Sequence, residues 1–260
     1  MNKASARRAR LKIAPANLSV TTPVRNCSLA AWAYLEIRDQ ILKGVLPFGT
    51  VLSRRKLATD LDISVPPLME ALQRLERDGL VESKPRVGTR VRMPTRQDVK
   101  DRSQLREALE SQAARLFAAR ATTAERQKLR RMGRHVDRLY AACEKNCDRE
   151  FLFSTNSYHM KLHLRIAENA RCAVLRDAIE KEQVLIFNWL FDTAAERRSL
   201  GSDFHARLTD ALASGTPDVA ARAMRRHIRF GLQEVLAGLK KFSGDKSKPR
   251  WRYQRTVRRY

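Results

Sequence analysis

The chain has 260 residues, of which 43% are hydrophobic, and it carries a formal net charge of +24 at pH 7. This length allows two domains of ordinary size, and the composition supports packed cores and excludes a largely disordered chain. No apolar run approaches the roughly 20 residues that span a bilayer, and residues 1–11 lack the apolar stretch of a secretory signal, so we expect a cytoplasmic protein without a membrane partner.

The excess positive charge is concentrated at the two ends. Residues 1–29 carry +6 and residues 240–260 carry +8, which is more than half of the total. We interpret residues 1–29 as a flexible basic arm and residues 242–260 as a basic tail that attract phosphates without reading sequence. A solubilising tail without a specific partner explains the same composition equally well. The four cysteines match no paired metal-binding spacing, so free thiols in a reducing compartment are expected.

Residues 30–94 predict a first folded domain, which begins with an amphipathic helix over residues 30–43. The apolar side chains expected to face its core are Trp32, Leu35, Ile37, Ile41 and Leu42. Ser53 has the position and chemistry of an N-cap for a short helix, and Ser64 has those of an N-cap for a second helix. Gly79 has the position of the glycine that follows a helix end.

A basic hairpin follows the second helix. Two short strands are expected at residues 80–81 and 90–93, and Gly88 permits a tight turn between them. Two short helices with a small polar turn, followed by a basic hairpin, form an arrangement that reads DNA. The pattern over residues 44–91 therefore predicts a winged helix-turn-helix, and Pro94 marks the end of this domain.

Basic side chains occupy places that stability alone does not favour. Arg54, Arg55 and Lys56 lie in the first turn of a helix, where cations oppose the helix dipole, so nearby phosphates or base edges explain them better than a solvated face does. Pro66 is tolerated in the first turn of the second helix because the amides there have no intrahelical acceptor. The candidate DNA-binding residues are Arg54, Arg55, Lys56, Ser64, Val65, Pro66, Met69, Lys84, Arg86, Thr89 and Arg90.

Residues 95–241 carry a helical period almost throughout and predict an all-helical bundle with short connections. The expected helices cover residues 98–120, 122–143, 148–168, 172–192, 202–214 and 217–241. The fold class is therefore mainly α, with an N-terminal winged helix-turn-helix and a C-terminal all-α helical bundle.

Four of the five histidines form a candidate metal site in this bundle. His159 and His163 are spaced i, i+4, which places both imidazoles on one face of one helix. His205 and His227 lie beside apolar stripes of the last two expected helices. Four imidazoles that converge in a bundle core would suit Zn²⁺ or Ni²⁺, although each histidine taken singly is more often an ordinary core or surface residue.

Residues 44–91 resemble the winged helix-turn-helix of GntR-type bacterial repressors. The resemblance rests on fixed spacings of these residues: Gly44, Leu46, Pro47, Gly49, Leu52, Ser53, Leu57, Ala58, Leu61, Ile63, Ser64, Pro67, Leu68, Glu70, Ala71, Leu72, Leu75, Gly79, Leu80, Val81, Gly88, Thr89 and Val91. It implies a homodimer that binds a palindromic operator in double-stranded DNA. Val65 and Met69 stand where the family usually has base-reading arginines, whereas Arg55 keeps a third such position. This departure leaves three alternatives: apolar readout such as that of thymine methyls, affinity from the wing and arms, or degenerate DNA binding.

The histidine segments resemble the FCD effector domain, named after fatty-acid regulators. The resemblance rests on residues 163–175, residues 204–215, residues 223–227 and a first helix that contains Arg106. Metal-binding members of this subfamily use one Asp and three His. The resemblance implies a site of His159, His163, His205 and His227, with His159 in the Asp position. A neutral imidazole set favours Zn²⁺, our first choice, or Ni²⁺ or Cu²⁺ over Mg²⁺ or Mn²⁺.

The same resemblance implies an open coordination position for a small carboxylate metabolite. Arg106 is a candidate to hold that carboxylate, and a salt bridge on the helix surface is an equal alternative for it. We therefore expect a metabolite-responsive DNA-binding regulator, a repressor by family analogy, rather than an enzyme. The alternatives are a nonspecific basic DNA-binding protein with degenerate base readout and a metal-dependent hydrolase, for which only the off-face Glu168 offers a general base.

Overall fold

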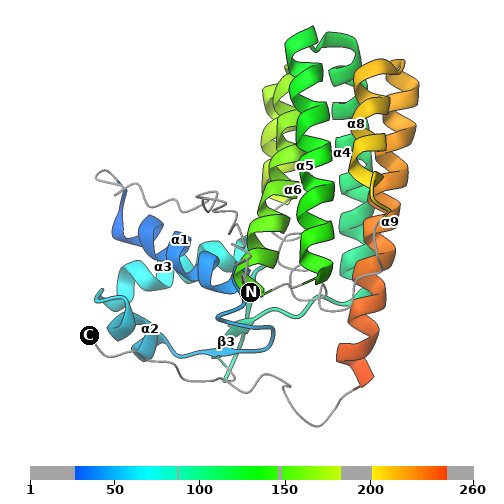
Figure 1. Ribbon diagram of the computed structural model, residues 1–260. Helices are drawn as coiled ribbons and strands as arrows, with labels where there is room; N and C mark the ends of the chain where they lie inside the picture. The colour runs from blue at the N-terminus through cyan, green and yellow to red at the C-terminus, as the bar shows by residue number, and fades with distance from the viewer. Residues whose placement is uncertain (1–26, 87, 146–147, 183–200, 245–260) are drawn as a thin grey trace, which may run out of the picture.

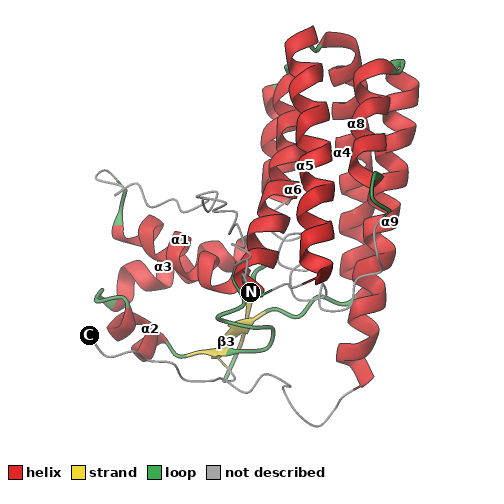
Figure 2. Cartoon of the chain, viewed as in Figure 1, coloured by secondary structure: helices red, strands yellow, loops and turns green. Residues whose placement is uncertain are grey.

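The computed structural model describes residues 27–86, 88–145, 148–182 and 201–244, and most of the two basic ends predicted at residues 1–29 and 242–260 lies outside them. A small helical domain with a short sheet lies beside the foot of a tall helical bundle, so the fold is mainly helical, as predicted (Figures 1 and 2). No helix in the described residues is long and apolar enough to cross a membrane.

The N-terminal domain consists of three helices and a three-stranded sheet. The helices are α1 (Leu29–Leu42), α2 (Arg54–Asp60) and α3 (Val65–Arg77). The strands are β1 (Val51–Leu52), β2 (Val81–Lys84) and β3 (Gly88–Val91), in the antiparallel order β1-β3-β2. Val81 pairs with Val91 and Val51 pairs with Arg90, so β3 lies in the middle of the sheet. These elements confirm the winged helix-turn-helix.

The caps of this domain follow the sequence with one exception. The Ser53 hydroxyl accepts a hydrogen bond from the Lys56 amide (3.3 Å) and so caps α2. Ser64 occupies the N-cap position of α3, but its side chain makes no capping hydrogen bond. Gly79 follows the end of α3 with φ of 78°, the left-handed conformation that favours glycine.

The core of the N-terminal domain differs from the expectation at one large residue. Ile37 and Ile41 of α1 are buried, whereas the Trp32 side chain remains 37% exposed. Ala33 and Tyr34 are buried next to it, which shows that the buried face of α1 is centred on the 33/34/37/41 positions. The expectation that Trp32 faces the core is therefore wrong.

The bundle contains α4 (Arg96–Arg120), α5 (Thr123–Lys145), α6 (Arg149–Asn169), α8 (Phe204–Ser214) and α9 (Pro217–Gly244). Residues 173–182 are helical as predicted, and the rest of the helix expected at 172–192 lies outside the described residues. A capping box starts α4, since Thr95 accepts from the Asp98 amide and Asp98 accepts from the Thr95 amide.

Three of the bundle helices reach the N-terminal domain, and the first of them is α4, whose Val99 belongs to the apolar cluster of that domain. One apolar cluster joins buried residues of that domain to Met160 of α6 and to Val235, Leu236 and Leu239 of α9. A second cluster fills the bundle around Phe117, Leu162 and Met224. The bundle therefore has its own core and also extends the core of its neighbour.

The cysteines depart from the expectation of free thiols. Cys27 and Cys172 are free, but Cys143, near the end of α5, is disulfide-bonded.

Candidate functional site

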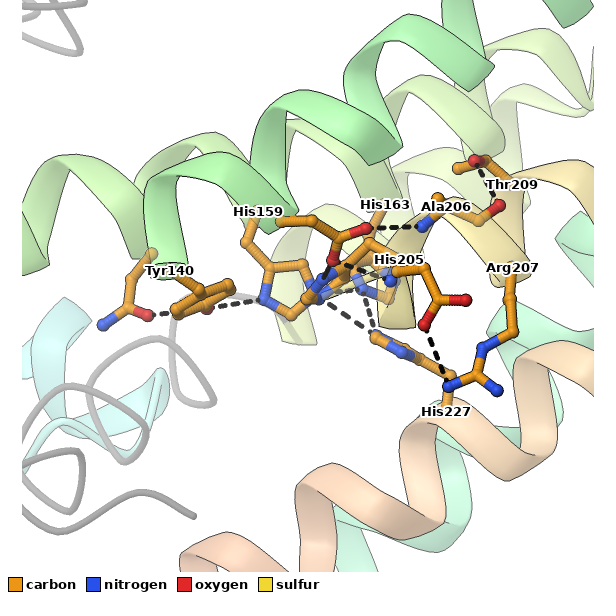
Figure 3. A network of polar contacts seen from close by, with 11 residues as sticks. Tyr140, His159, His163, His205, Ala206, Arg207, Thr209 and His227 are labelled. Carbon is orange, nitrogen blue, oxygen red and sulfur yellow. Dashed lines mark hydrogen bonds and ion pairs between the residues drawn. The ribbon is translucent and has the colours of Figure 1, made fainter. Parts of the chain in front are cut away.

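The four histidines singled out in the sequence meet inside the bundle (Figure 3). His159 and His163 come from α6, His205 from the start of α8 and His227 from the middle of α9, and all four are buried. The Nε2 atoms of His159 and His163 are 3.0 Å apart, and the Nε2 atom of His227 lies 3.2 and 3.1 Å from them. His205 belongs to the same group, because ring nitrogens of His159, His205 and His227 all lie within 4.8 Å of one another.

Each of three histidines is held through its other ring nitrogen. The Nδ1 atom of His163 contacts the Glu110 carboxylate, and that of His205 lies 2.7 Å from Asp137 Oδ1. The Nδ1 atom of His159 lies 3.0 Å from the Tyr140 hydroxyl, which donates its own proton to Asn156 Oδ1. Carboxylates and this hydroxyl therefore accept, and the three Nδ1 atoms donate.

This pattern fixes the protonation of the facing atoms. A neutral imidazole carries one N–H group, so Nδ1 donors leave bare lone pairs on the Nε2 atoms. The lone pairs on Nε2 of His159 and His163, which lie 3.0 Å apart, repel one another unless a cation lies between them. His227 adds a buried Nδ1 atom without a hydrogen-bond partner. The arrangement matches metal-ligating histidines, which donate their second N–H to a carboxylate or similar acceptor.

The electrostatics keep two of the imidazoles neutral and two of the neighbouring carboxylates charged. Burial, and then the neighbouring imidazoles, hold the pKa values of His159 and His227 well below their usual range. Burial raises the pKa of Glu110, but the positive charge of Arg106 and the contact with His163 outweigh it and lower this pKa to about 2. Burial likewise raises the pKa of Asp137, and hydrogen bonds from His205 and the Ala206 amide lower it below its usual range.

The spacing of the donors fits a first-row transition metal. Zinc binds imidazole nitrogen at about 2.0–2.1 Å, which puts neighbouring ligand nitrogens of a four- to six-coordinate ion about 2.9–3.4 Å apart. The observed Nε2 separations of 3.0–3.2 Å fall in that range. Neutral nitrogen donors backed by ionised carboxylates suit zinc or nickel better than hard cations that prefer oxygen.

Arg106 is part of this site but does not lie on the helix surface. Its side chain is buried, and its Nε atom pairs with Glu110, one turn further along α4. Arg106, Glu110 and His163 therefore form a buried chain of contacts, because Glu110 also contacts His163. Its charge is close enough to contribute to the lowered pKa values of His159 and His227.

Sequence reasoning missed the residues behind the histidines. Glu110 could have been found as the i+4 partner of Arg106 on the expected helix. Asp137 could not, because it is one acid on a strongly basic helix, and its partners lie 68 and 69 positions along the chain. Asp137 also caps α8, since its two oxygens accept from the amides of His205 (2.9 Å) and Ala206 (2.8 Å).

The structure places most of the candidate DNA-binding side chains on the outside of the N-terminal domain. Those with exposed side chains are Arg54, Arg55, Lys56, Ser64, Val65, Pro66, Lys84 and Arg86. Arg90 is half-buried and pairs with Glu82 (2.5 Å). Thr89 is buried and hydrogen-bonds Ser83 (3.0 Å), and Met69 packs partly against the core. The side chain of Thr89 thus lies away from the surface that the other residues form.

Comparisons with known proteins agree with both parts of the fold. The family described as bacterial regulatory proteins, gntR family, matches residues 29–91, and the FCD domain matches residues 101–230. A protein named "Probable D-xylose utilization operon transcriptional repressor" from Paenarthrobacter nicotinovorans is 30% identical over 202 residues, covering 74% of this chain and 84% of its own length. The HTH-type transcriptional repressor RspR of Escherichia coli strain K12 is 25% identical, covering 82% of this chain and 90% of its own length.

Solved structures show the same fold. A GntR transcriptional regulator from Rhodococcus sp. RHA1 matches with a TM-score of 0.67 and 20% identity, covering 81% of this chain and 99% of that one. McbR/YncC of E. coli matches with a TM-score of 0.62 and 22% identity, covering 84% and 100%. The matching families are regulators of transcription and not enzymes. The chain therefore belongs to the GntR family of bacterial transcriptional regulators and carries an FCD domain as its C-terminal part.

Proposed function

We propose that this regulator is a homodimeric repressor whose operator binding responds to a small carboxylate metabolite at a transition-metal site. The observation that carries the proposal is the convergence of four buried imidazoles, three of which are held through Nδ1 and three of which bring their Nε2 atoms within 3.2 Å of one another. His159, His163, His205 and His227 would hold the ion, and zinc is our first choice. When bound, such an ion supplies a Lewis-acidic position to which a carboxylate can coordinate.

In this proposal each domain has its own role. Residues 30–94 would contact a palindromic operator, and residues 95–241 would bind the effector and form the dimer. Exposed cations support the first part, because Arg54 and Arg55 on α2 and Lys84 and Arg86 on the hairpin can all meet phosphates. The basic ends, residues 1–29 and 242–260, would add affinity that does not depend on sequence.

Arg106 is the candidate contact for the effector carboxylate. Its bond to Glu110 uses Nε, and a guanidinium has two further nitrogens that can grip a carboxylate side by side. Its buried position beside the histidines would make such a contact strong and selective for a negative charge. Glu110 would keep both Arg106 and His163 in place.

The helices that carry the histidines also provide a route to the DNA-binding domain. His159 and His163 share α6 with Met160, and His227 shares α9 with Val235 and Leu236. Met160, Val235 and Leu236 belong to the apolar cluster of the N-terminal domain. A ligand that favours one arrangement of α6 and α9 would thereby favour one placement of that domain, which is what coupling between two sites requires.

The first experiment measures the metal content of the purified full chain. We expect about one transition-metal ion per chain in the wild type and none in a His163→Ala/His205→Ala variant. His135→Ala is the matched control, because His135 lies outside the cluster against Tyr158 (ring centroids 4.6 Å apart). A wild-type protein that is metal-free and also refuses zinc and nickel on titration would overturn the metal site.

Operator binding has its own test. We expect an operator with two-fold symmetry to be enriched from random duplexes and to bind far more tightly than unrelated DNA at the same salt concentration. If all duplexes bind alike with a steep salt dependence, the chain is the nonspecific basic DNA-binding protein instead.

A further inference from the structure

We propose that the first turn of α3 reads the C5-methyl group of a pyrimidine in the major groove through an apolar patch of Val65, Pro66 and Met69. This inference rests on the proposed operator binding and specifies what the operator contains. The methyl group belongs to thymine or to 5-methylcytosine, which present the same carbon at the same place on the base.

The patch lies where a helix-turn-helix meets base edges. In this fold the N-terminal residues of the second helix contact the bases. Val65 is the first residue of α3, and its side chain is 45% exposed. Pro66 beside it is exposed, and Met69, half-buried, lies one turn further on the same face as Val65. The side chains that the start of α3 presents to a groove are therefore apolar.

The same turn is poorly equipped to bind a phosphate. A helix N-terminus binds anions through its free first-turn amides. Pro66 and Pro67 occupy the second and third positions of α3 and carry no N–H group, so two of those donors are missing. Phosphate contacts are left to the cations around the patch.

The cations around the patch are free to contact phosphates. Arg54 and Arg55 on α2 are exposed, and no carboxylate in the described part of the chain lies at ion-pair distance from either. α2 packs against α3, and the hairpin that follows α3 adds the exposed Lys84 and Arg86. An apolar patch within a basic surface fits DNA better than a protein partner, because the regular phosphates of a duplex can pair with all of the surrounding cations.

The chemistry of the groove then selects the base. The thymine C5-methyl is the largest apolar group that the four ordinary base pairs present in the major groove, because cytosine offers only a C5–H there and the other edge atoms are polar donors or acceptors. Carbon packed against a polar edge would leave that edge without its hydrogen bonds to water. Binding therefore favours a methylated pyrimidine at the position that faces Val65.

The test begins with an operator enriched by the full wild-type chain from random duplexes at one fixed salt concentration. Each thymine is then replaced in turn by deoxyuridine, which removes only the methyl group. We expect one position in each half-site where this replacement weakens wild-type binding about fourfold, the worth of one buried methyl group. Cytosine at that position should bind weakly, and 5-methylcytosine should restore the affinity.

Variants connect the effect to the patch. Val65→Ala should bind the original operator and the operator with deoxyuridine at that position equally well. Val45→Ala is the matched control, because Val45 is 49% exposed but lies in the turn after α1, and it should retain the full effect. Val65 is exposed, so its truncation is not expected to disturb the fold.

The outcomes separate this inference from the function on which it rests. An enriched operator that tolerates every deoxyuridine replacement would overturn methyl readout and leave operator binding intact. A Val65→Ala protein that keeps the wild-type sensitivity would overturn methyl readout in the same way. Failure to enrich any operator would overturn the proposed function, and methyl readout with it.

Discussion

The buried charge of Arg106 depends on one carboxylate. Glu110 pairs with Arg106 and contacts His163, and both side chains of the ion pair are almost fully buried. Glu110→Gln keeps the shape and a carbonyl acceptor for His163 but leaves Arg106 without a counter-charge. Removing one partner of a buried pair costs about 3–5 kcal/mol, so the free energy of unfolding in urea should fall by that amount.

A second substitution distinguishes charge from shape. Arg106→Met combined with Glu110→Gln removes both charges and should recover most of the lost stability, because a buried pair can often be replaced by neutral groups at little cost. A Glu110→Gln protein within about 1 kcal/mol of the wild type would contradict the role of the pair.

At Arg171 the contacts of the side chain offset the strain of an unfavourable backbone conformation. It follows α6 with φ of 54°, and its guanidinium contacts both Glu125 oxygens (3.0 and 3.1 Å) and the Arg120 carbonyl (3.2 Å). Arg171→Ala loses these contacts and keeps the strain, whereas Arg171→Gly loses the contacts and relieves it. We expect the glycine variant to be more stable than the alanine variant by about 1 kcal/mol in thermal or urea unfolding.

The reverse order of those two variants would show that Arg171 bears no strain. Ala173→Gly, at the first residue of the next helical segment, is the control. There glycine should destabilise by about 0.5–1 kcal/mol, because a helix position gains nothing from its freedom.

What the sequence could predict of the site depends on the range of the signal. The i, i+4 spacing of His159 and His163 is a local pattern, and the apolar stripes beside His205 and His227 point those rings inward. The i, i+4 spacing of Arg106 and Glu110 indicates their ion pair, but the contact of Glu110 with His163 and that of Asp137 with His205 arise only when α4 meets α6 and α5 meets α8. Tertiary contacts of single polar residues leave no periodic trace in one sequence.

At the scale of elements, the start of α4 couples the two domains. Asp98 accepts hydrogen bonds from the amide (2.9 Å) and hydroxyl (2.8 Å) of Thr95 and pairs with Arg92 (2.8 Å), which follows β3. Burial raises the pKa of Asp98, but these hydrogen bonds and the Arg92 charge outweigh it and lower the pKa below its usual value. The charged carboxylate therefore stabilises the fold above the unfolded pKa, and that stability is lost as the pH falls through the folded pKa.

Asp98→Asn tests this contribution. The variant should be less stable than the wild type by about 1 kcal/mol at pH 7, from weaker capping and the lost ion pair. The difference should shrink below about pH 4, where the wild-type carboxylate is progressively protonated. Urea unfolding at pH 7, 5, 4 and 3 measures it, and a difference that stays constant over that range would contradict a role for the charge.

Where α5 packs against α8, the two helices lie so close at Gly133 that no side chain fits there. A Cβ atom at Gly133 would lie 2.4 Å from Thr209 Oγ1 and 2.8 Å from the His205 carbonyl oxygen. Gly133→Ala must therefore push α8 and His205 away, and we expect a loss of about 1–3 kcal/mol in stability together with weaker metal binding. Adding Thr209→Ala should recover part of the loss, since the His205 carbonyl still interferes.

Gly231 in α9 is the matched control for Gly133. A Cβ atom there meets nothing within 4 Å. Gly231→Ala should leave metal binding unchanged and stabilise the protein by up to about 1 kcal/mol through helix propensity. Equal effects of the two alanine substitutions would show that the α5–α8 contact does not position His205.

Helices with a long stretch of periodic sequence were predictable, whereas a very short strand and the exposure of a single side chain were not. The helix expected at 148–168 is observed at Arg149–Asn169, because twenty periodic residues outweigh any local irregularity. The two-residue strand β1 carries no period and was missed, although it completes the sheet. Trp32 shows the limit for side chains, since an apolar residue within one helical turn of the buried face can still be exposed.

At the scale of the whole molecule, one helix links two cores. Near its middle α9 carries His227 and packs into the bundle through Ile228, and near its end Val235, Leu236 and Leu239 join the N-terminal core. The Leu236 carbonyl also accepts a hydrogen bond from Arg96 (3.2 Å) at the start of α4. Protein interiors are close-packed, so a shift of α9 at one end is transmitted to the other rather than absorbed.

Leu236→Ala should weaken that transmission without touching the metal site. In the wild type we expect zinc, compared with a chelator, to change operator affinity by a factor in the range of about 5 to 150 that is usual for coupled sites. In Leu236→Ala the metal content should stay the same, while the factor falls towards one, because the methyl groups that carry contact across the domain boundary are gone. Ile228→Ala truncates α9 inside the bundle's own core and serves as the control for the general loss of stability. If Ile228→Ala reduced the factor and Leu236→Ala left it unchanged, the signal would have to leave the bundle by another route. The described helices that offer one are α6, through Met160, and α4, which joins Glu110 beside His163 to Val99 in the N-terminal core.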